Sequence, residues 1–324
     1  MMDLSGVDSV RDELRAFLKL QPAYRPPTAH LLERTDEDGY TRSLLRYHTA
    51  DSDQVDAFLF EPSGPSGGAV LALHQHNSQW EIGKSEIAGL LGDPLQAFGP
   101  ALARRGVTVL APDATGFESR MKSAGWGTSL APPLNRPHST AEGWLQYYNE
   151  MAYRLVRGDL LMTKILHDCF SALEVLRSHS KVLRPGVVGH SFGGTIALFL
   201  AAVDTSVAFT CSSGALCSYR QKMASGTALE ASLVIPGFQT HFDLDDVLRC
   251  AAPRKILIVS SDRDAQSVDA PRLVENARQE FVKQGAGFDL QHVRVSGEHA
   301  LDQNRFDLIV NWMDKEGRRV SPGE

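Results

Sequence analysis

The sequence lacks the features that mark several large classes of protein. Among its 324 residues, 39 are acidic and 33 are Lys or Arg, so it has no basic excess with which to bind the phosphates of nucleic acid. No apolar run approaches the ~18 residues that a membrane-spanning helix needs. The charged, amphipathic start, MMDLSGVDSVRDELRAFLKL, has no apolar stretch typical of a signal peptide. We therefore expect a cytoplasmic protein that binds neither nucleic acid nor a membrane.

Cysteine is also scarce. The four cysteines are Cys169, Cys211, Cys217 and Cys250, and none has the Cys-x-x-Cys spacing of a metal site. Two disulfides are arithmetically possible. In a long chain without a secretion signal we expect free and mostly buried thiols instead.

Alternating strands and helices dominate the rest of the chain. Helical periodicity predicts an N-terminal helix over 8–20, and two extended runs at 41–48 and 54–62 predict a hairpin. Buried strands are predicted at 69–74, 107–112, 185–190, 207–213, 255–261 and 288–296, and helices at about 93–105, 158–179, 195–203, 270–284 and 302–316. This alternation is typical of an α/β fold with a mostly parallel central sheet and helices on both faces. We expect one domain over 1–324, with cap insertions at about 113–157 and 214–252.

The stretch GHSFGG, residues 189–194, follows a predicted strand and precedes a predicted helix. A Gly-x-Ser-x-Gly pattern in that position forms a sharp turn that projects the serine from the end of the sheet. The alternative is a glycine-rich turn with a buried serine. The strand and helix on either side favour Ser191 as a nucleophile.

A serine nucleophile needs a base and a group that orients the base. On this architecture the acid and then the histidine follow the serine, each after a later strand. His299 is the sole histidine after the last predicted strand, and its alternative is a surface loop residue. Asp262 and Asp264 both follow the strand 255–261. Turn spacing favours Asp264, and Asp262 stays open.

The developing oxyanion needs two backbone N–H groups. We expect one from Phe192, directly after the serine, and one from His76 in the loop after the strand 69–74, with Gln75 as the alternative. His74 and His76 alternate in that loop and could share a metal. No third ligand has compatible spacing, so we expect no metal or cofactor.

The insertion at 113–157 is rich in aromatic residues that could form the roof of a pocket. We expect the following residues to contact the substrate: Gln75, His74, Trp126, Trp144 and Tyr147. Tyr148 could add to the same surface. The alternative is that these aromatic side chains form the core of the insertion itself.

Charged residues of the same insertion have more than one interpretation. Glu142 and Glu150 could face a cationic group of a ligand or could simply be solvated. Asp113, Glu118 and Arg120 follow the strand 107–112 and could support the pocket. We assign none of them a catalytic role.

Four blocks of the sequence resemble the α/β-hydrolase family, near its dienelactone-hydrolase and acetyl-esterase-like branches. They are LALHQHN at 71–77, APDATGFESR at 111–120, GHSFGG at 189–194, and SSDRD at 260–264 with GEHA at 297–300. The resemblance covers the chain from about Tyr40 and implies the α/β-hydrolase fold. Gln75 stands where the family commonly has glycine, which affects the expected oxyanion geometry. Ser191 replaces the cysteine of dienelactone hydrolases, which favours ester chemistry.

A narrower resemblance is to the serine-dependent macrolide esterases of antibiotic resistance, through the His-Gln-His-Asn loop, the cytoplasmic start and the aromatic insertion. It implies opening of a macrocyclic lactone. The expected function is hydrolysis of a carboxylic ester or lactone through an acyl-enzyme, with a small molecule as partner. The alternatives are a general small-ester carboxylesterase or deacetylase, haloperoxidase-like or C–C bond hydrolase chemistry, and a non-catalytic binding protein of the same fold.

Overall fold

The structure is a computed structural model that describes residues 5–21, 26–121 and 140–319. Trp126, which we expected to contact the substrate, lies outside these residues. The described strands are β1 (His30–Glu37), β2 (Tyr40–His48), β3 (Gln54–Pro62), β4 (Gly68–Leu73), β5 (Val107–Pro112), β6 (Gly186–His190), β7 (Phe209–Ser213), β8 (Lys255–Ser261) and β9 (Leu290–Val295). They form one sheet in the order β1-β2-β3-β5-β4-β6-β7-β8-β9.

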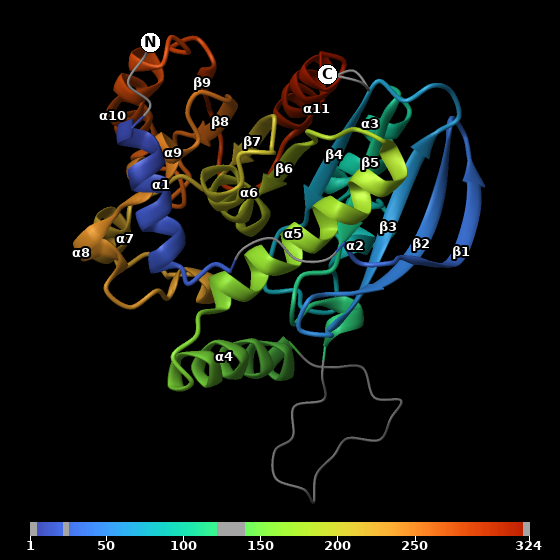
Figure 1. Ribbon diagram of the computed structural model, residues 1–324, viewed down its shortest axis with the longest axis horizontal. Helices are drawn as coiled ribbons and strands as arrows, with labels where there is room; N and C mark the ends of the chain where they lie inside the picture. Colours follow the sequence, from blue (N-terminus) through green and yellow to red (C-terminus); the bar gives the residue numbers. More distant parts are fainter. Residues whose placement is uncertain (1–4, 22–25, 122–139, 320–324) are drawn as a thin grey trace, which may run out of the picture.

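Helices lie on both faces of this sheet (Figure 1). They are α1 (Ser5–Phe17), α2 (Lys84–Ile87), α3 (Phe98–Ala103), α4 (Thr140–Val156), α5 (Leu161–Ser180), α6 (Phe192–Val203), α7 (Tyr219–Ser225), α8 (Phe238–His241), α9 (Leu244–Cys250), α10 (Ala270–Lys283) and α11 (Gln303–Gly317). Three short 3₁₀ helices are η1 (Pro94–Gln96), η2 (Glu118–Arg120) and η3 (Ala231–Leu233).

The parallel sheet and its antiparallel edge are confirmed. Strands from β5 to β9 pair in parallel along the sheet, while β3 joins β5 antiparallel and carries β2 and β1 outward. The outermost strand, β1, was not predicted. Its residues are almost all exposed, so neither alternation nor an apolar run distinguishes it from a loop.

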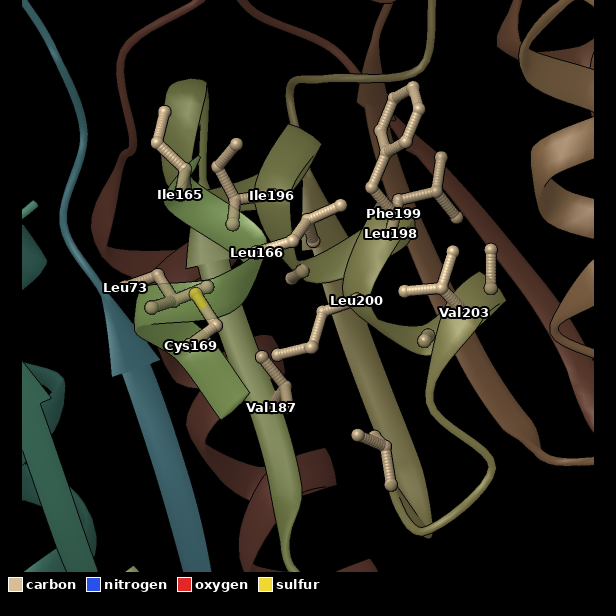
Figure 2. Packing of buried hydrophobic residues seen from close by; sticks show 14 of the residues in the cluster. Leu73, Ile165, Leu166, Cys169, Val187, Ile196, Leu198, Phe199, Leu200 and Val203 are labelled. Atoms are coloured by element: carbon tan, nitrogen blue, oxygen red, sulfur yellow. The ribbon is translucent and has the colours of Figure 1, made fainter. Parts of the chain in front are cut away.

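Successive residues of the central strands supply two separate cores. Val187 on β6 packs into the core that holds Leu166 of α5 and Leu200 of α6, as Figure 2 shows. Its neighbour Val188 faces the opposite core, with Ile309 of α11. Side chains of a strand point alternately to the two faces, so a strand covered by helices on both sides must be apolar throughout.

The single helix predicted over 93–105 is wrong. The structure has η1 at Pro94–Gln96 and a separate helix α3 beginning at Phe98. Pro100 has no N–H to donate, so it fits only in the first turn of a helix, where no intrahelical acceptor is available. This proline therefore fixes the start of α3 close to residue 98.

Both predicted insertions contain helical elements. The first contains η2 and α4, and α4 lies below α5 in Figure 1, at the lower side of the coloured ribbon. The second folds into α7, η3, α8 and α9. All four cysteines are free and buried, as expected. Within the described ranges, no helix combines the length and the apolar character that a membrane crossing requires.

Candidate active site

Ser191 occupies a tight turn between β6 and α6. Its backbone has φ 56° and ψ −120°, a positive φ that side-chain-bearing residues rarely adopt. The Ser191 N–H donates to the carbonyl of Ser213 on the adjacent strand β7 at 2.8 Å. The turn thus holds the serine at the end of the sheet, between a strand and a helix N-terminus.

The glycines around Ser191 are required by close backbone contacts. A Cβ on Gly193 would lie 2.1 Å from the carbonyl oxygen of Leu73, and one on Gly189 would lie 2.2 Å from the carbonyl carbon of Gly193. Both distances are far below van der Waals contact. The first contact also shows that the start of α6 packs directly on the end of β4.

Three predicted residues from distant parts of the chain meet at this turn. The Nε2 atom of His299 lies 2.8 Å from the Ser191 Oγ. The other ring nitrogen, Nδ1, lies 2.9 Å from Oδ1 of Asp264. His299 comes from the loop after β9 and Asp264 from the loop after β8. The structure therefore connects a serine, a histidine and a carboxylate in one chain of hydrogen bonds.

The structure also separates the two candidate acids. Asp264 is 2% exposed, and it accepts hydrogen bonds from the Gln266 N–H at 2.8 Å and the Ser267 hydroxyl at 2.7 Å. Burial opposes the ionised form, but the bonds from His299 and Ser267 outweigh it and lower the pKa of Asp264. Asp262 is exposed and instead accepts the Gly297 N–H at 2.9 Å. Asp264, and not Asp262, contacts His299.

Arg305 on α11 lies behind His299 and was not anticipated from the sequence. Its guanidinium donates to the backbone carbonyl of His299 at 3.1 Å and to the hydroxyls of Ser261 and Ser213 at 2.9 and 3.1 Å. Arg305 is 1% exposed, and burial lowers its pKa. An arginine within an amphipathic helix carries no sequence signal of such a contact.

The two residues expected to supply the oxyanion donors, Phe192 and His76, line the same cleft as Ser191. Phe192 is the first residue of α6, so its N–H has no acceptor within the helix. His76 follows β4 and lines the same cleft as Ser191, Phe192 and His299. Its ring is packed against aromatic neighbours, with the Trp80 ring 4.9 Å away between centroids.

The expectation that His74 and Gln75 contact the substrate needs correction. His74 is buried, and its ring bonds to the Gln75 carbonyl at 2.8 Å and accepts the Ala114 N–H at 3.1 Å. The Gln75 side chain donates to Glu86 at 2.8 Å. Both side chains are thus held by the protein itself, outside the cleft lined by Ser191. Alternation along the loop did not reveal these partners, which are distant in sequence.

Burial lowers the pKa of both His74 and His76 to about 4, so both rings are neutral near pH 7. The His76 Nδ1 accepts the Ser78 N–H at 2.9 Å. Over the part of the chain that the structure describes, no group of three or more His, Cys, Asp or Glu side chains is arranged to hold a metal ion.

A buried ionic cluster supports the loop after β4. The Lys84 ammonium lies 2.9 Å from Asp113 and also binds Glu118, while the Gly83 N–H donates to Glu118 at 2.9 Å. Arg120 pairs with Asp168 of α5 at 2.7 Å. Asp113 and Glu118 therefore tie the loops after β4 and β5 together, and Arg120 joins the second of these loops to α5.

The Ser191 hydroxyl and the His299 ring open onto a cleft of about 490 Å³, a size typical of small-molecule sites. Aromatic residues of α4 form one wall. The rings of Trp144 and Tyr148 stack with centroids 5.4 Å apart, and Trp144 is 55% exposed. Tyr147 is buried at the cleft and donates its hydroxyl to Glu230 at 2.7 Å. Trp144 and Tyr147 thus line the cleft onto which Ser191 opens, and their contact with a substrate stays a prediction.

The proposed contact of Glu150 with a cationic ligand group is not supported. Its carboxylate binds Arg154 one helical turn away at 2.8 Å, and Glu150 is not among the residues of the cleft. The cleft instead contains a lysine that the sequence analysis missed, Lys222 on α7, beside Gln266.

Comparisons with known proteins show the family and the fold of this chain. The sequence pattern of the alpha/beta hydrolase family matches residues 70–314. A Bacillus subtilis (strain 168) protein named "Putative hydrolase YtaP" is 26% identical over 305 residues, or 89% of this chain and 92% of that protein.

Two solved structures share the fold. One is a Bacteroides fragilis NCTC 9343 protein named as a "putative acetyl xylan esterase", with a TM-score of 0.72, 16% identity, and coverage of 96% of this chain and 87% of that one. The other is a glucuronoyl esterase from Solibacter usitatus, with a TM-score of 0.66, 13% identity, and coverage of 98% and 94%.

Proposed function

Because the chain belongs to the alpha/beta hydrolase family, we propose that it is a serine hydrolase that cleaves carboxylic esters through an acyl-enzyme. One observation carries the proposal. Ser191, His299 and Asp264 form a chain of hydrogen bonds, and the Ser191 hydroxyl at its end lines an open cleft. The names of two structural neighbours, both esterases, support the same chemistry.

In the proposed mechanism, His299 takes the Ser191 proton through Nε2 as the serine oxygen attacks the ester carbonyl. Asp264 accepts a hydrogen bond from the Nδ1–H of His299. This bond fixes the tautomer and stabilises the imidazolium cation that forms, while Asp264 stays ionised. His299 then donates the proton to the departing alcohol. Water attacks the acyl-enzyme by the same relay and releases the acid.

The negative charge on the tetrahedral intermediate requires donors that are already in place. We assign this role to the backbone N–H groups of Phe192 and His76. The contact between Gly193 and the Leu73 carbonyl supports the assignment, since it fixes the two segments against each other. Removal of one such donor typically costs about 10²–10³ in kcat.

Replacement of the serine tests the nucleophile. Ser191→Ala should lower kcat for 4-nitrophenyl acetate by more than about 10³-fold, because the relay then has no nucleophile. Ser178→Ala, at an exposed position on α5, is the matched control. Full activity of Ser191→Ala would overturn the proposal, and a wild-type protein inactive on every ester would favour a binding role.

Which ester the cleft accepts is a separate question. The aromatic wall of Trp144, Tyr147 and Tyr148 offers a broad apolar surface beside the serine, which favours a bulky ligand such as a macrocyclic lactone. The alternative is a small ester, such as an acetyl ester. Incubation with a sixteen-membered macrolide should add the mass of one water if the lactone opens, and only when Ser191 is present. No mass change, together with turnover of small aryl esters, would select the alternative.

A further inference from the structure

Lys222 is a buried cation without a carboxylate partner. It lies on α7, is 3% exposed, and lines the cleft that holds Ser191 and His299. Its ammonium donates to the side-chain oxygen of Gln266. Among the described residues, no Asp or Glu oxygen lies within 4.0 Å of its Nζ.

The other buried lysines of the described structure show how this chain normally accommodates such a charge. Lys84 binds two carboxylates, and Lys164 binds three, from Asp51, Asp53 and Asp168. Burial of an ammonium is costly unless it is paired and hydrogen-bonded. Among the buried lysines that the structure describes, Lys222 alone lines the cleft, and it departs from this pattern.

The carboxylate that lines the same cleft as Lys222, that of Glu230, already accepts hydrogen bonds from other groups. Glu230 accepts the Tyr147 hydroxyl at 2.7 Å through one oxygen and the Ser232 N–H at 2.9 Å through the other. Burial raises the pKa of Glu230 and lowers that of Lys222. Glu230 therefore braces α4 against η3 and leaves the lysine ammonium free for another acceptor.

Lys222 also has a fixed position relative to the reacting atoms. The Gln266 side chain accepts from Lys222, while the Gln266 N–H donates to Asp264 at 2.8 Å. A single residue therefore links the ammonium to the carboxylate that holds His299. An ammonium has three donors, and Gln266 accounts for one of them.

We propose that the Lys222 ammonium binds an anionic group, such as a carboxylate, on the ester substrate, so that the enzyme selects esters bearing a negative charge. This inference rests on the proposed ester hydrolysis and names the substrate class for the same cleft. The substrate anion supplies the partner that the protein itself supplies to Lys84 and Lys164. The aromatic wall contacts the uncharged part of the same molecule.

Paired substrates that differ in charge test the inference. One pair carries the charge on the acyl group, namely mono-4-nitrophenyl adipate and 4-nitrophenyl hexanoate. The other carries it on the alcohol, namely 4-acetoxybenzoate and 4-acetoxyacetophenone. In at least one pair, Lys222→Met should lower the anionic-to-neutral ratio of kcat/KM by about tenfold to a hundredfold, the usual size of a lost charge-assisted hydrogen bond.

Matched variants separate charge from folding. Lys222→Arg keeps the charge and should retain more of the preference than Lys222→Met. Lys283→Met removes an exposed lysine on α10 and should leave the ratio unchanged. If Lys222→Met does not fold, Lys222→Gln takes its place. If Lys222→Met leaves the anionic-to-neutral ratio of kcat/KM unchanged in both substrate pairs, the inference is overturned.

Binding measured without turnover keeps the two proposals distinct. Calorimetric titration of Ser191→Ala with mono-4-nitrophenyl adipate and with 4-acetoxybenzoate should show binding that weakens at least about tenfold when Lys222→Met is added. No binding, or equal affinity in both proteins, would refute the anion site. A wild-type protein that hydrolyses no ester would refute the proposed function, while this titration would still decide the role of Lys222.

Discussion

The guanidinium of Arg305 donates a hydrogen bond to the backbone carbonyl of His299 at 3.1 Å. It does not touch the imidazole that reaches Ser191. The same guanidinium bonds the Ser213 and Ser261 hydroxyls at the ends of β7 and β8. Arg305 therefore joins the loop that carries His299 to the ends of β7 and β8, and we assign it the role of a positioning residue.

Arg305→Met should lower kcat for an aryl ester by about tenfold to a hundredfold with little change in KM, since small misplacements of a catalytic group cost about that much. The unfolding temperature should fall less than it would after loss of one partner of a buried ion pair, because no carboxylate is left unpaired. Arg318→Met, an exposed arginine just after α11, is the control. A fall in thermal stability together with a lower kcat and a higher KM would indicate a merely structural role.

Asp264→Asn and Asp262→Asn should differ sharply. Loss of the carboxylate that orients the histidine lowers kcat by about 10⁴-fold in comparable triads, and only Asp264 contacts His299. Asp262 holds the Gly297 N–H at the surface, so its substitution should have a far smaller effect. Steady-state kinetics of both variants measure the difference, and the reverse order would reassign the acid.

Gly193→Ala should abolish activity through the backbone. The new methyl group would lie 2.1 Å from the Leu73 carbonyl, so the end of β4 must move and the His76 N–H must move with it. Gly64→Ala, whose added methyl meets no atom within 4 Å, is the control. Activity and circular dichroism of both variants test this, and an active, folded Gly193→Ala would show that the two segments are not rigidly coupled.

His74 should contribute to acid sensitivity. Burial lowers its pKa from 6.5 to about 4, so between these pH values the unfolded chain binds a proton that the folded protein excludes. The free energy of unfolding therefore falls as pH decreases through this range, by up to about 3 kcal/mol from this group.

His74→Gln removes this titration and can still accept the Ala114 N–H. Urea unfolding at pH 4.5 and pH 7.5 should show a smaller loss of stability on acidification in the variant than in the wild type. An equal loss in both proteins would mean that other groups govern the acid response.

The sequence predicted the elements whose signal is local. A strand buried on both faces must be apolar throughout, so β4 through β8 were recognisable from their composition. The order of Ser191, acid and histidine follows from the order of the parallel strands, whose carboxyl ends share one edge. Turn spacing after β8 favoured Asp264, the residue that the structure places against His299.

Tertiary structure decided the rest, because it depends on contacts between residues far apart in the chain. The exposed strand β1 is defined only by its pairing with β2. The side chains of His74 and Gln75 leave the cleft because Ala114 and Glu86 bind them.

The same reason applies to the two cations beside the site. Nothing near Lys222 or Arg305 in the sequence distinguishes them from solvated residues of amphipathic helices. Their burial, and their positions next to Gln266 and His299, arise only when α7 packs beside the cleft and α11 packs against the sheet. The sequence by itself determined the apolar central strands and the loops that carry the serine, the acid and the histidine, while long-range packing determined which other groups surround them.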